Sequence, residues 1–194
     1  MSSFIAYLSR LKYVYRWGLK RNTAIENDME HSYMAAVISH MLAVSTNVRY
    51  SGSLDIGKVT LLAVFHDSSE VLTGDMPTPI KHFDRNIYEA YTKMEEHAAN
   101  KLLGILPEDL RPSFSGLLKP DKDADEWKVV KAADRIAAYI KCMEEIKAGN
   151  REFEQALEEV GSDLKNNKLP AVADFMTEFA PSFTMTLDQL SNNV

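Results

Sequence analysis

The chain has 194 residues, of which 45% are hydrophobic, and it carries a formal net charge of −6. This length and composition favour one globular domain over residues 1–194. The acidic charge argues against a nucleic-acid polymer as a partner, because such affinity requires clustered Lys and Arg, but small phosphorylated molecules are compatible with it. The single cysteine, Cys142, cannot form an intrachain disulfide, which agrees with a reducing compartment.

The chain shows no signal region and no apolar run of the roughly 20 residues needed to cross a bilayer. A soluble, cytoplasmic protein without membrane association is therefore expected. Apolar residues recur at three- and four-residue spacing, and no segment has the alternation of a strand, so the sequence predicts an all-α fold, a single-domain helical bundle. The predicted helices cover residues 3–16, 30–48, 56–72, 86–103, 108–118, 125–148, 152–165 and 171–179, with a last turn at Leu187.

Several helix ends carry recognisable signals. Asp55 suits the N-cap of the helix predicted from residue 56. Pro77 and Pro79 disfavour a helix over residues 76–80, which leaves residues 73–83 as an ordered loop. Three glycines stand where a helix end would turn into the left-handed conformation: Gly18, Gly74 and Gly149.

The most apolar predicted helix runs directly into His66 and Asp67. His66 follows Leu62 by four residues and Ala63 by three, so it continues the buried stripe of that helix. Asp67 lies about 100° further round. An ionised carboxylate beside a core is costly unless a cation or hydrogen bonds compensate it. The pair is therefore a candidate for metal binding.

Two other predicted helices repeat this pattern. His31 shares the inward face of its helix with apolar residues, and Asp134 lies four residues after Val130 and three before Ala137. Two imidazoles and two carboxylates suit manganese, cobalt, iron or zinc better than calcium. The sequence predicts one divalent metal ion, with positions left for water and substrate, held by four residues: His31, His66, Asp67 and Asp134.

The other three histidines do not extend this set. His40 lies about half a revolution from His31 on the same helix, so it faces away. His82 and His97 have no partner at ligand spacing, and a second metal is not expected.

The ordered set of His31, His66 with Asp67, and Asp134 resembles the HD metal-dependent phosphohydrolases, in which these positions hold the metal. From about residue 4 to residue 190, the chain is also similar to the bacterial HD-domain 5′-deoxynucleotidases. The segments that carry this resemblance are LSRLK at 8–12, RW at 16–17, RN at 21–22, EHS at 30–32, HDSSEVLTGD at 66–75, PTP at 77–79 with Lys81, KAAD at 131–134 and YIKC at 139–142. The resemblance implies a homodimer that removes phosphate from deoxyribonucleoside 5′-monophosphates.

Two carboxylates are candidates for catalysis. Glu70 follows His66 by four residues and Asp67 by three, so on one continuous helix it lies over the same end as the ligands. We expect it to orient or deprotonate the attacking water that the metal activates. Asp75 follows Gly74, and we expect it to protonate the leaving 5′-oxygen or to hold the sugar.

Substrate binding is predicted at two places. Arg16 ends the first predicted helix, where its guanidinium can grip a phosphate with two parallel hydrogen bonds. The resemblance implies that Trp17 contacts the nucleotide with it, and a ring beside the ribose would exclude a 2′-hydroxyl by bulk. Thr78 and Lys81 are weaker candidates for phosphate or sugar binding.

Other interpretations remain open on the sequence. A different HD activity is the nearest enzyme alternative: hydrolysis of nucleoside triphosphates, cyclic phosphodiesters or guanosine tetraphosphate. A nucleotide sensor that binds metal without turnover is a second alternative. A helical dimerisation module in which the polar groups are only buried pairs is a third.

Overall fold

The structure is a computed structural model that describes residues 1–192. The all-α prediction is confirmed, because residues 1–192 contain helices, turns and loops without a β-strand. An isolated antiparallel bridge joins Tyr15 to Asn27. None of the described helices is both long enough and apolar enough to span a membrane. The α-helices are α1 (Phe4–Leu8), α2 (Asp28–Arg49), α3 (Ile56–Phe65), α4 (Glu70–Thr73), α5 (Thr78–Lys81), α6 (Arg85–Ile105), α7 (Arg111–Leu118), α8 (Asp125–Lys147), α9 (Glu154–Lys165), α10 (Pro170–Glu178) and α11 (Leu187–Ser191), and the 3-10 helices are η1 (Ser9–Tyr13), η2 (Arg151–Phe153) and η3 (Ala180–Thr184).

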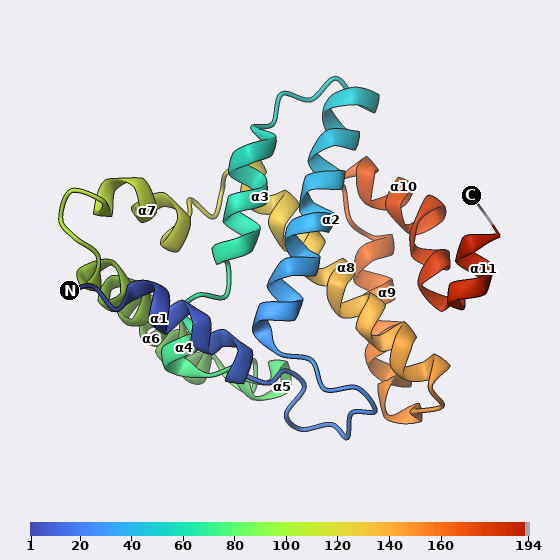
Figure 1. Cartoon of the computed structure of the whole chain (residues 1–194). Helices are drawn as coiled ribbons and strands as arrows, with labels where there is room; N and C mark the ends of the chain where they lie inside the picture. Colours follow the sequence, from blue (N-terminus) through green and yellow to red (C-terminus); the bar gives the residue numbers. More distant parts are fainter. Residues whose placement is uncertain (193–194) are drawn as a thin grey trace.

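Helices α2, α3 and α8 form the centre of the molecule (Figure 1). Alanines without exposed surface stand on all three, at Ala35, Ala63 and Ala133, and small side chains let helices approach closely. Asn27 starts α2 with a capping box, since its side chain accepts from the N–H groups of Met29 and Glu30. The close packing brings together the ends and faces that carry the predicted metal ligands.

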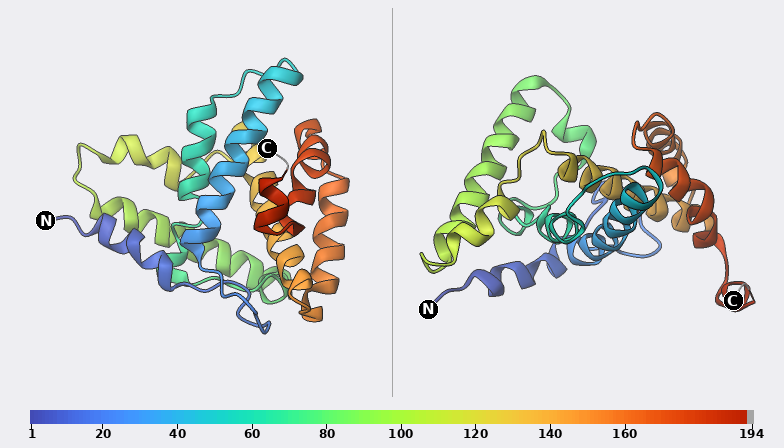
Figure 2. Two further views of the ribbon diagram at one scale, coloured as in Figure 1. Left: turned by 45° about the vertical axis from the view of Figure 1, so that its right-hand side comes forward. Right: turned by 90° about the horizontal axis from the view of Figure 1, so that it is seen from above.

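The remaining helices cover two sides of this centre, with α1 on one side and α11 on the other (Figures 1 and 2). On one side, α1, α6 and α7 enclose a second small core around Phe4 and Leu102. On the other side, α9 and η3 pack against α8, and α10 packs against α2. They extend the main core through Val160 and Val172.

The helix predicted over 56–72 is wrong in one respect, because the chain breaks at the predicted ligands. Helix α3 ends at Phe65, His66 caps it, and residues 67–69 form turns before α4 begins. The N–H of Ser68 bonds to the carbonyl of Phe65 and that of Glu70 to the carbonyl of Asp67, so each bond spans three residues and tightens the backbone. His66 and Asp67 therefore stand at a helix end.

The first predicted helix is also shorter than expected. It stops at Tyr13, and an extended segment follows, in which the N–H of Arg16 bonds to the carbonyl of Glu26. Trp17 takes the left-handed conformation (φ 60°), which was predicted for Gly18. The same prediction is confirmed for Gly74 and Gly149.

Two further boundaries differ from the prediction. Residues 78–81 form the short helix α5, because Pro79 lies in its first turn, where the missing N–H of proline is not needed. Helix α7 begins at Arg111, three residues later than predicted. The N-cap predicted at Asp55 is confirmed, since its side chain accepts from the N–H of Lys58.

Candidate active site

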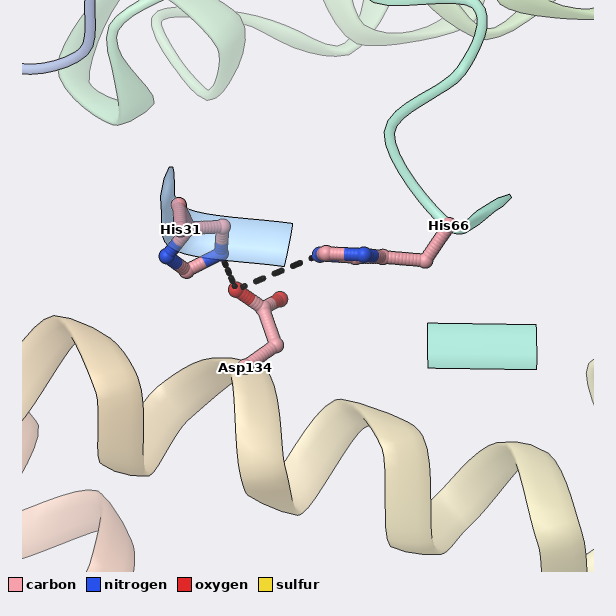
Figure 3. Close-up of side chains that lie close together, drawn as sticks. All are labelled: His31, His66 and Asp134. Carbon is pink, nitrogen blue, oxygen red and sulfur yellow. Dashed lines mark hydrogen bonds and ion pairs between the residues drawn. The ribbon is translucent and has the colours of Figure 1, made fainter. Parts of the chain in front are cut away.

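Three helices bring two histidines and an aspartate to one point (Figure 3). His31 lies in the first turn of α2, His66 caps α3, and Asp134 lies within α8. The Oδ1 atom of Asp134 is 3.0 Å from Nε2 of His31 and 3.8 Å from Nε2 of His66. Ligand atoms of these three residues lie within 4.8 Å of one another, a spacing suited to a metal ion.

Asp67 completes the predicted set. Its Oδ2 atom is 3.0 Å from Nε2 of His66 and 3.8 Å from Nε2 of His31. The two histidine side chains are at most 1% exposed, whereas Asp67 and Asp134 are 14% and 20% exposed. The cluster is thus buried on the imidazole side and accessible on the carboxylate side, where water and a substrate would enter.

The tautomer of His66 fits a metal ligand. Its Nδ1 atom is 2.8 Å from the carbonyl oxygen of Ala63, which can only accept a hydrogen bond, so Nδ1 carries the proton. The lone pair of the neutral ring is then on Nε2, which faces the carboxylates and has no hydrogen-bond partner among the described residues. A backbone acceptor that orients a histidine in this way is the usual support of a metal site. The donor set suits a divalent transition metal.

The charges of the cluster reinforce one another. Burial opposes ionisation of Asp67, but His66 and Arg16 outweigh it and hold the pKa of Asp67 below its ordinary value. The pKa of Asp134 is lowered for the same reason, against burial, by Lys131 and the two histidines. Burial also opposes a charge on His66, but the carboxylates dominate and raise its pKa to about 10. A cation is therefore strongly favoured here.

Arg16 reaches this centre from an extended segment, and Trp17 follows it in the chain; their contact with a nucleotide stays a prediction. Nη1 of Arg16 is 3.3 Å from Oδ2 of Asp67, and its Nε is 3.3 Å from Glu26. The indole Nε1 of Trp17 donates to the same Glu26 carboxylate at 3.2 Å. The Trp17 ring packs on Phe153, with centroids 5.2 Å apart.

Glu70 also lies at the centre, but it is not on the same helix as His66, contrary to the sequence prediction. It begins α4, after the break in the chain, and its carboxylate clusters with those of Asp67 and Asp28 within 4.8 Å. Burial and these two carboxylates raise the pKa of Glu70 to about 11. Glu70 thus holds a proton when no metal ion is bound.

Asp28 is a site residue that the sequence reasoning missed. It is fully buried, and neither carboxylate oxygen has a hydrogen-bond partner among the described residues, although Nη1 of Arg16 is 3.7 Å from Oδ1. Burial raises its pKa to about 7, with Glu70 as its neighbour. One signal was available: Asp28 precedes His31 by three residues and so shares its face of α2.

The other predicted substrate residues lie on the segment after Gly74. Burial raises the pKa of Asp75, and the backbone of Trp17 hydrogen-bonds its carboxylate. Lys81 is engaged by α6, since its Nζ pairs with Glu95 at 2.8 Å and lies 4.7 Å from the centre of the Tyr91 ring. Thr78 is exposed on α5. Substrate binding by these residues stays a prediction.

An all-helical bundle in which a histidine, a His-Asp pair and a distant aspartate converge defines a metal-dependent phosphohydrolase of the HD class. The family model described as "5′-deoxynucleotidase YfbR-like" matches residues 3–183. The chain belongs to this YfbR-like 5′-deoxynucleotidase family.

Relatives with the same family name match this chain over nearly its whole length. The 5′-deoxynucleotidase of Vibrio cholerae is 46% identical over 191 residues, with 98% of each chain covered. That of Erwinia tasmaniensis is 43% identical, with 98% of this chain and 96% of the relative covered. The family resemblance seen in the sequence is thereby confirmed, and the chain is an enzyme of a nucleotide phosphohydrolase family.

Solved structures support the fold. An HD-domain phosphohydrolase from Listeria innocua superposes with a TM-score of 0.82 over 98% of this chain and 96% of its own, at 24% identity. The HD phosphohydrolase DatZ of cyanophage S-2L, whose structure holds dA and one catalytic Zn²⁺ ion, reaches 0.64 over 93% of this chain and 96% of its own, at 19% identity. At these identities the likeness establishes the HD-type helical fold.

Proposed function

We propose that this protein hydrolyses deoxyribonucleoside 5′-monophosphates to deoxynucleosides and phosphate. The observation that carries the proposal is the convergence of two imidazoles and two carboxylates from three helices, with the Arg16 guanidinium 3.3 Å from Asp67. The names of the relatives, 46% and 43% identical over nearly the full length, support the same substrate class.

His31, His66, Asp67 and Asp134 would hold one divalent ion. When bound, such an ion lowers the pKa of a water ligand and offsets the charge of the phosphate. Cobalt, manganese, zinc and iron all suit this donor set, and the zinc in the cyanophage structure supports a divalent transition metal. A cytoplasmic location and a homodimer are part of the proposal, the latter from the family resemblance.

Arg16 is proposed to bind the phosphate. Its fixed fork of N–H groups matches two phosphate oxygens, and the carboxylates of Glu26, Asp28 and Asp67 hold it at the open side of the ligand cluster. Its charge then stabilises the negative charge that shifts during phosphoryl transfer.

Glu70 and Asp75 are proposed to move protons. Glu70, beside Asp67, would take the proton of the attacking water once it has lost its own, which its carboxylate neighbours hold in place. Asp75 would supply a proton to the leaving 5′-oxygen, and its raised pKa supports a protonated form.

Trp17 is proposed to read the sugar. Its backbone is left-handed, its ring packs on Phe153 and its indole N–H donates to Glu26, so two contacts hold the ring in place. A fixed ring rejects an added 2′-hydroxyl through bulk and an unmade hydrogen bond. Lys81 and Thr78 are secondary candidates for phosphate or sugar contact.

The test is phosphate release from matched deoxyribo- and ribonucleoside 5′-monophosphates. Protein stripped of metal would receive manganese, cobalt or zinc separately, with Asp67→Ala as the control. The expected result is metal-dependent release from the deoxy substrates only, lost in the variant. Release from both sugars would refute the role of Trp17, and no release from any monophosphate would refute the proposed function.

A further inference from the structure

A buried polar network lies on α8, outside the metal cluster. Lys141 and Glu145 form an ion pair in which the side chains are 4% and 1% exposed. Asn150, also buried, donates to Glu145 at 2.7 Å. The proposed chemistry does not use these groups, although Lys141 belongs to the YIKC segment that carries the family resemblance.

Outside residues 141–153, the hydrogen-bond partners of this network in the described part of the chain all belong to residues 21–24. The Glu145 carboxylate accepts from the backbone N–H groups of Thr23 at 2.9 Å and Ala24 at 3.1 Å, and from the Thr23 hydroxyl. Lys141 donates to the carbonyl oxygen of Ala24, and Asn150 donates to that of Arg21 at 2.7 Å. A buried carboxylate thus binds a loop tip that has no regular structure of its own.

That loop is the one that carries Arg16 and Trp17. Its two arms are joined by the bridge from Tyr15 to Asn27 and by the bond from the Arg16 N–H to the Glu26 carbonyl. Its tip is held only a few residues beyond Trp17. Phe153 packs on the Trp17 ring, and the centre of the Phe153 ring also lies 5.6 Å from Nζ of Lys141. The network therefore supports both the backbone and the ring surface of the proposed nucleotide-binding segment.

One helix connects this anchor to the metal cluster. Asp134 and Glu145 lie on α8, about 16 Å apart along its axis at a rise of 1.5 Å per residue. Buried charges that are fully paired hold one geometry, because any displacement leaves a charge or a donor without its partner. Helix α8 can thus fix the loop relative to the metal ligands.

We propose that Lys141 and Glu145 are positioning residues that set Arg16 and Trp17 against the metal cluster and thereby determine nucleotide binding. This inference rests on the proposed function, in which Arg16 and Trp17 contact the nucleotide. Neither Lys141 nor Glu145 touches the substrate, and both act through the loop of residues 14–27.

The first experiment compares Glu145→Gln with Glu144→Gln, an exposed neighbour on the same helix. Glu145→Gln should raise the KM for deoxyribonucleoside monophosphates by about 10- to 100-fold, with a smaller change in kcat and unchanged bound metal, because a small displacement of binding groups has effects of this size. Glu144→Gln should behave as wild type. Equal KM values for the two variants would overturn the inference.

The second experiment separates positioning from a general loss of structure. If Glu145 acts through Arg16 and Trp17, adding Glu145→Gln to the double variant R16A/W17A should change KM less than twofold, whereas independent sites would give multiplied effects. Should Glu145→Gln not fold, the paired substitution K141M/E145M replaces the ion pair with apolar groups of similar volume, which is often tolerated. Multiplied effects would overturn the inference.

A third measurement does not depend on activity. Amide hydrogen exchange of residues 14–24 should become faster in Glu145→Gln, while exchange in α3 and the middle of α8 stays as in wild type. An unchanged loop would refute the anchor. If exchange in the loop becomes faster in Glu145→Gln but the wild-type protein hydrolyses no monophosphate, the proposed function is refuted and the anchoring of the loop still holds.

Discussion

The guanidinium of Arg16 lies directly against a proposed metal ligand: its Nη1 atom is 3.3 Å from Oδ2 of Asp67. Asp28 and Glu26 contact the same guanidinium, so it belongs to the same charge system as the cluster. Burial opposes a charge on Arg16, but the surrounding carboxylates raise its pKa further above the ordinary value. A permanent cation therefore stands beside the site at every working pH.

Arg16→Lys should impair phosphate binding although it keeps the charge. A lysine offers one point charge instead of a fork, so kcat/KM for a deoxyribonucleoside monophosphate should fall by about 10- to 100-fold. Bound metal should be unchanged. Steady-state kinetics with metal analysis checks both, and full activity of this variant would contradict the assigned role.

Glu70→Gln should reduce kcat by about 10²- to 10⁴-fold, the range expected when a proton acceptor is removed. Metal content should stay as in wild type, because Glu70 is not one of the four proposed ligands. The exposed Glu108→Gln serves as the control. If the variant loses its metal together with its activity, Glu70 is a ligand and not the base.

Metal affinity should rise with pH across the neutral range. The carboxylates raise the pKa of His66 to about 10 despite its burial, so near pH 7 the ring is protonated and a metal must displace that proton. Release of one proton makes the affinity about tenfold higher per pH unit below this pKa. Competition with a chelating dye at pH 6, 7 and 8 measures the slope, and a flat profile would rule out proton displacement.

Asp28→Asn should stabilise the protein in chelator at neutral and higher pH. Burial raises the pKa of Asp28 from 3.8 to about 7, so the neutral form is favoured in the folded state. The protonated Asp28 side chain contributes fully to the stability of the folded state below the pKa of the unfolded chain, 3.8. That contribution is lost as the pH rises through the folded pKa of about 7. The wild type should therefore lose on the order of 1–3 kcal/mol relative to the Asn variant between pH 4 and 8. Urea unfolding of both proteins at pH 4 and pH 8 measures this change. An equal difference in unfolding free energy between wild type and variant at the two pH values would contradict the prediction.

The convergence of His31, His66 and Asp134 could be predicted because each continues an apolar stripe on a helix that packs in the core. His31, His66 and Asp134 needed only the helical period to be placed inward, and the family resemblance then fixed their order. The break after Phe65 could not be seen this way, since helical spacing continues through residue 72 while the backbone turns at the ligands.

The positions of Arg16 and Asp28 depend on contacts between distant segments. The extended segment around Arg16 is held by the bridge from Tyr15 to Asn27, which local propensity does not encode. An acidic residue in the first turn of a helix is ordinary, so the three-residue spacing from Asp28 to His31 was only a weak signal, and the burial of Asp28 arises only where the loop and α4 close over α2. These are properties of the tertiary structure.

The ligands come from three helices that are far apart in the chain. The unfolded polypeptide consequently has no such site. An ion bound by these residues would link the start of α2, the end of α3 and the middle of α8. The free energy of ion binding at the proposed site would be added to the free energy of folding, so removing the metal would lower the stability of the protein as well as its activity.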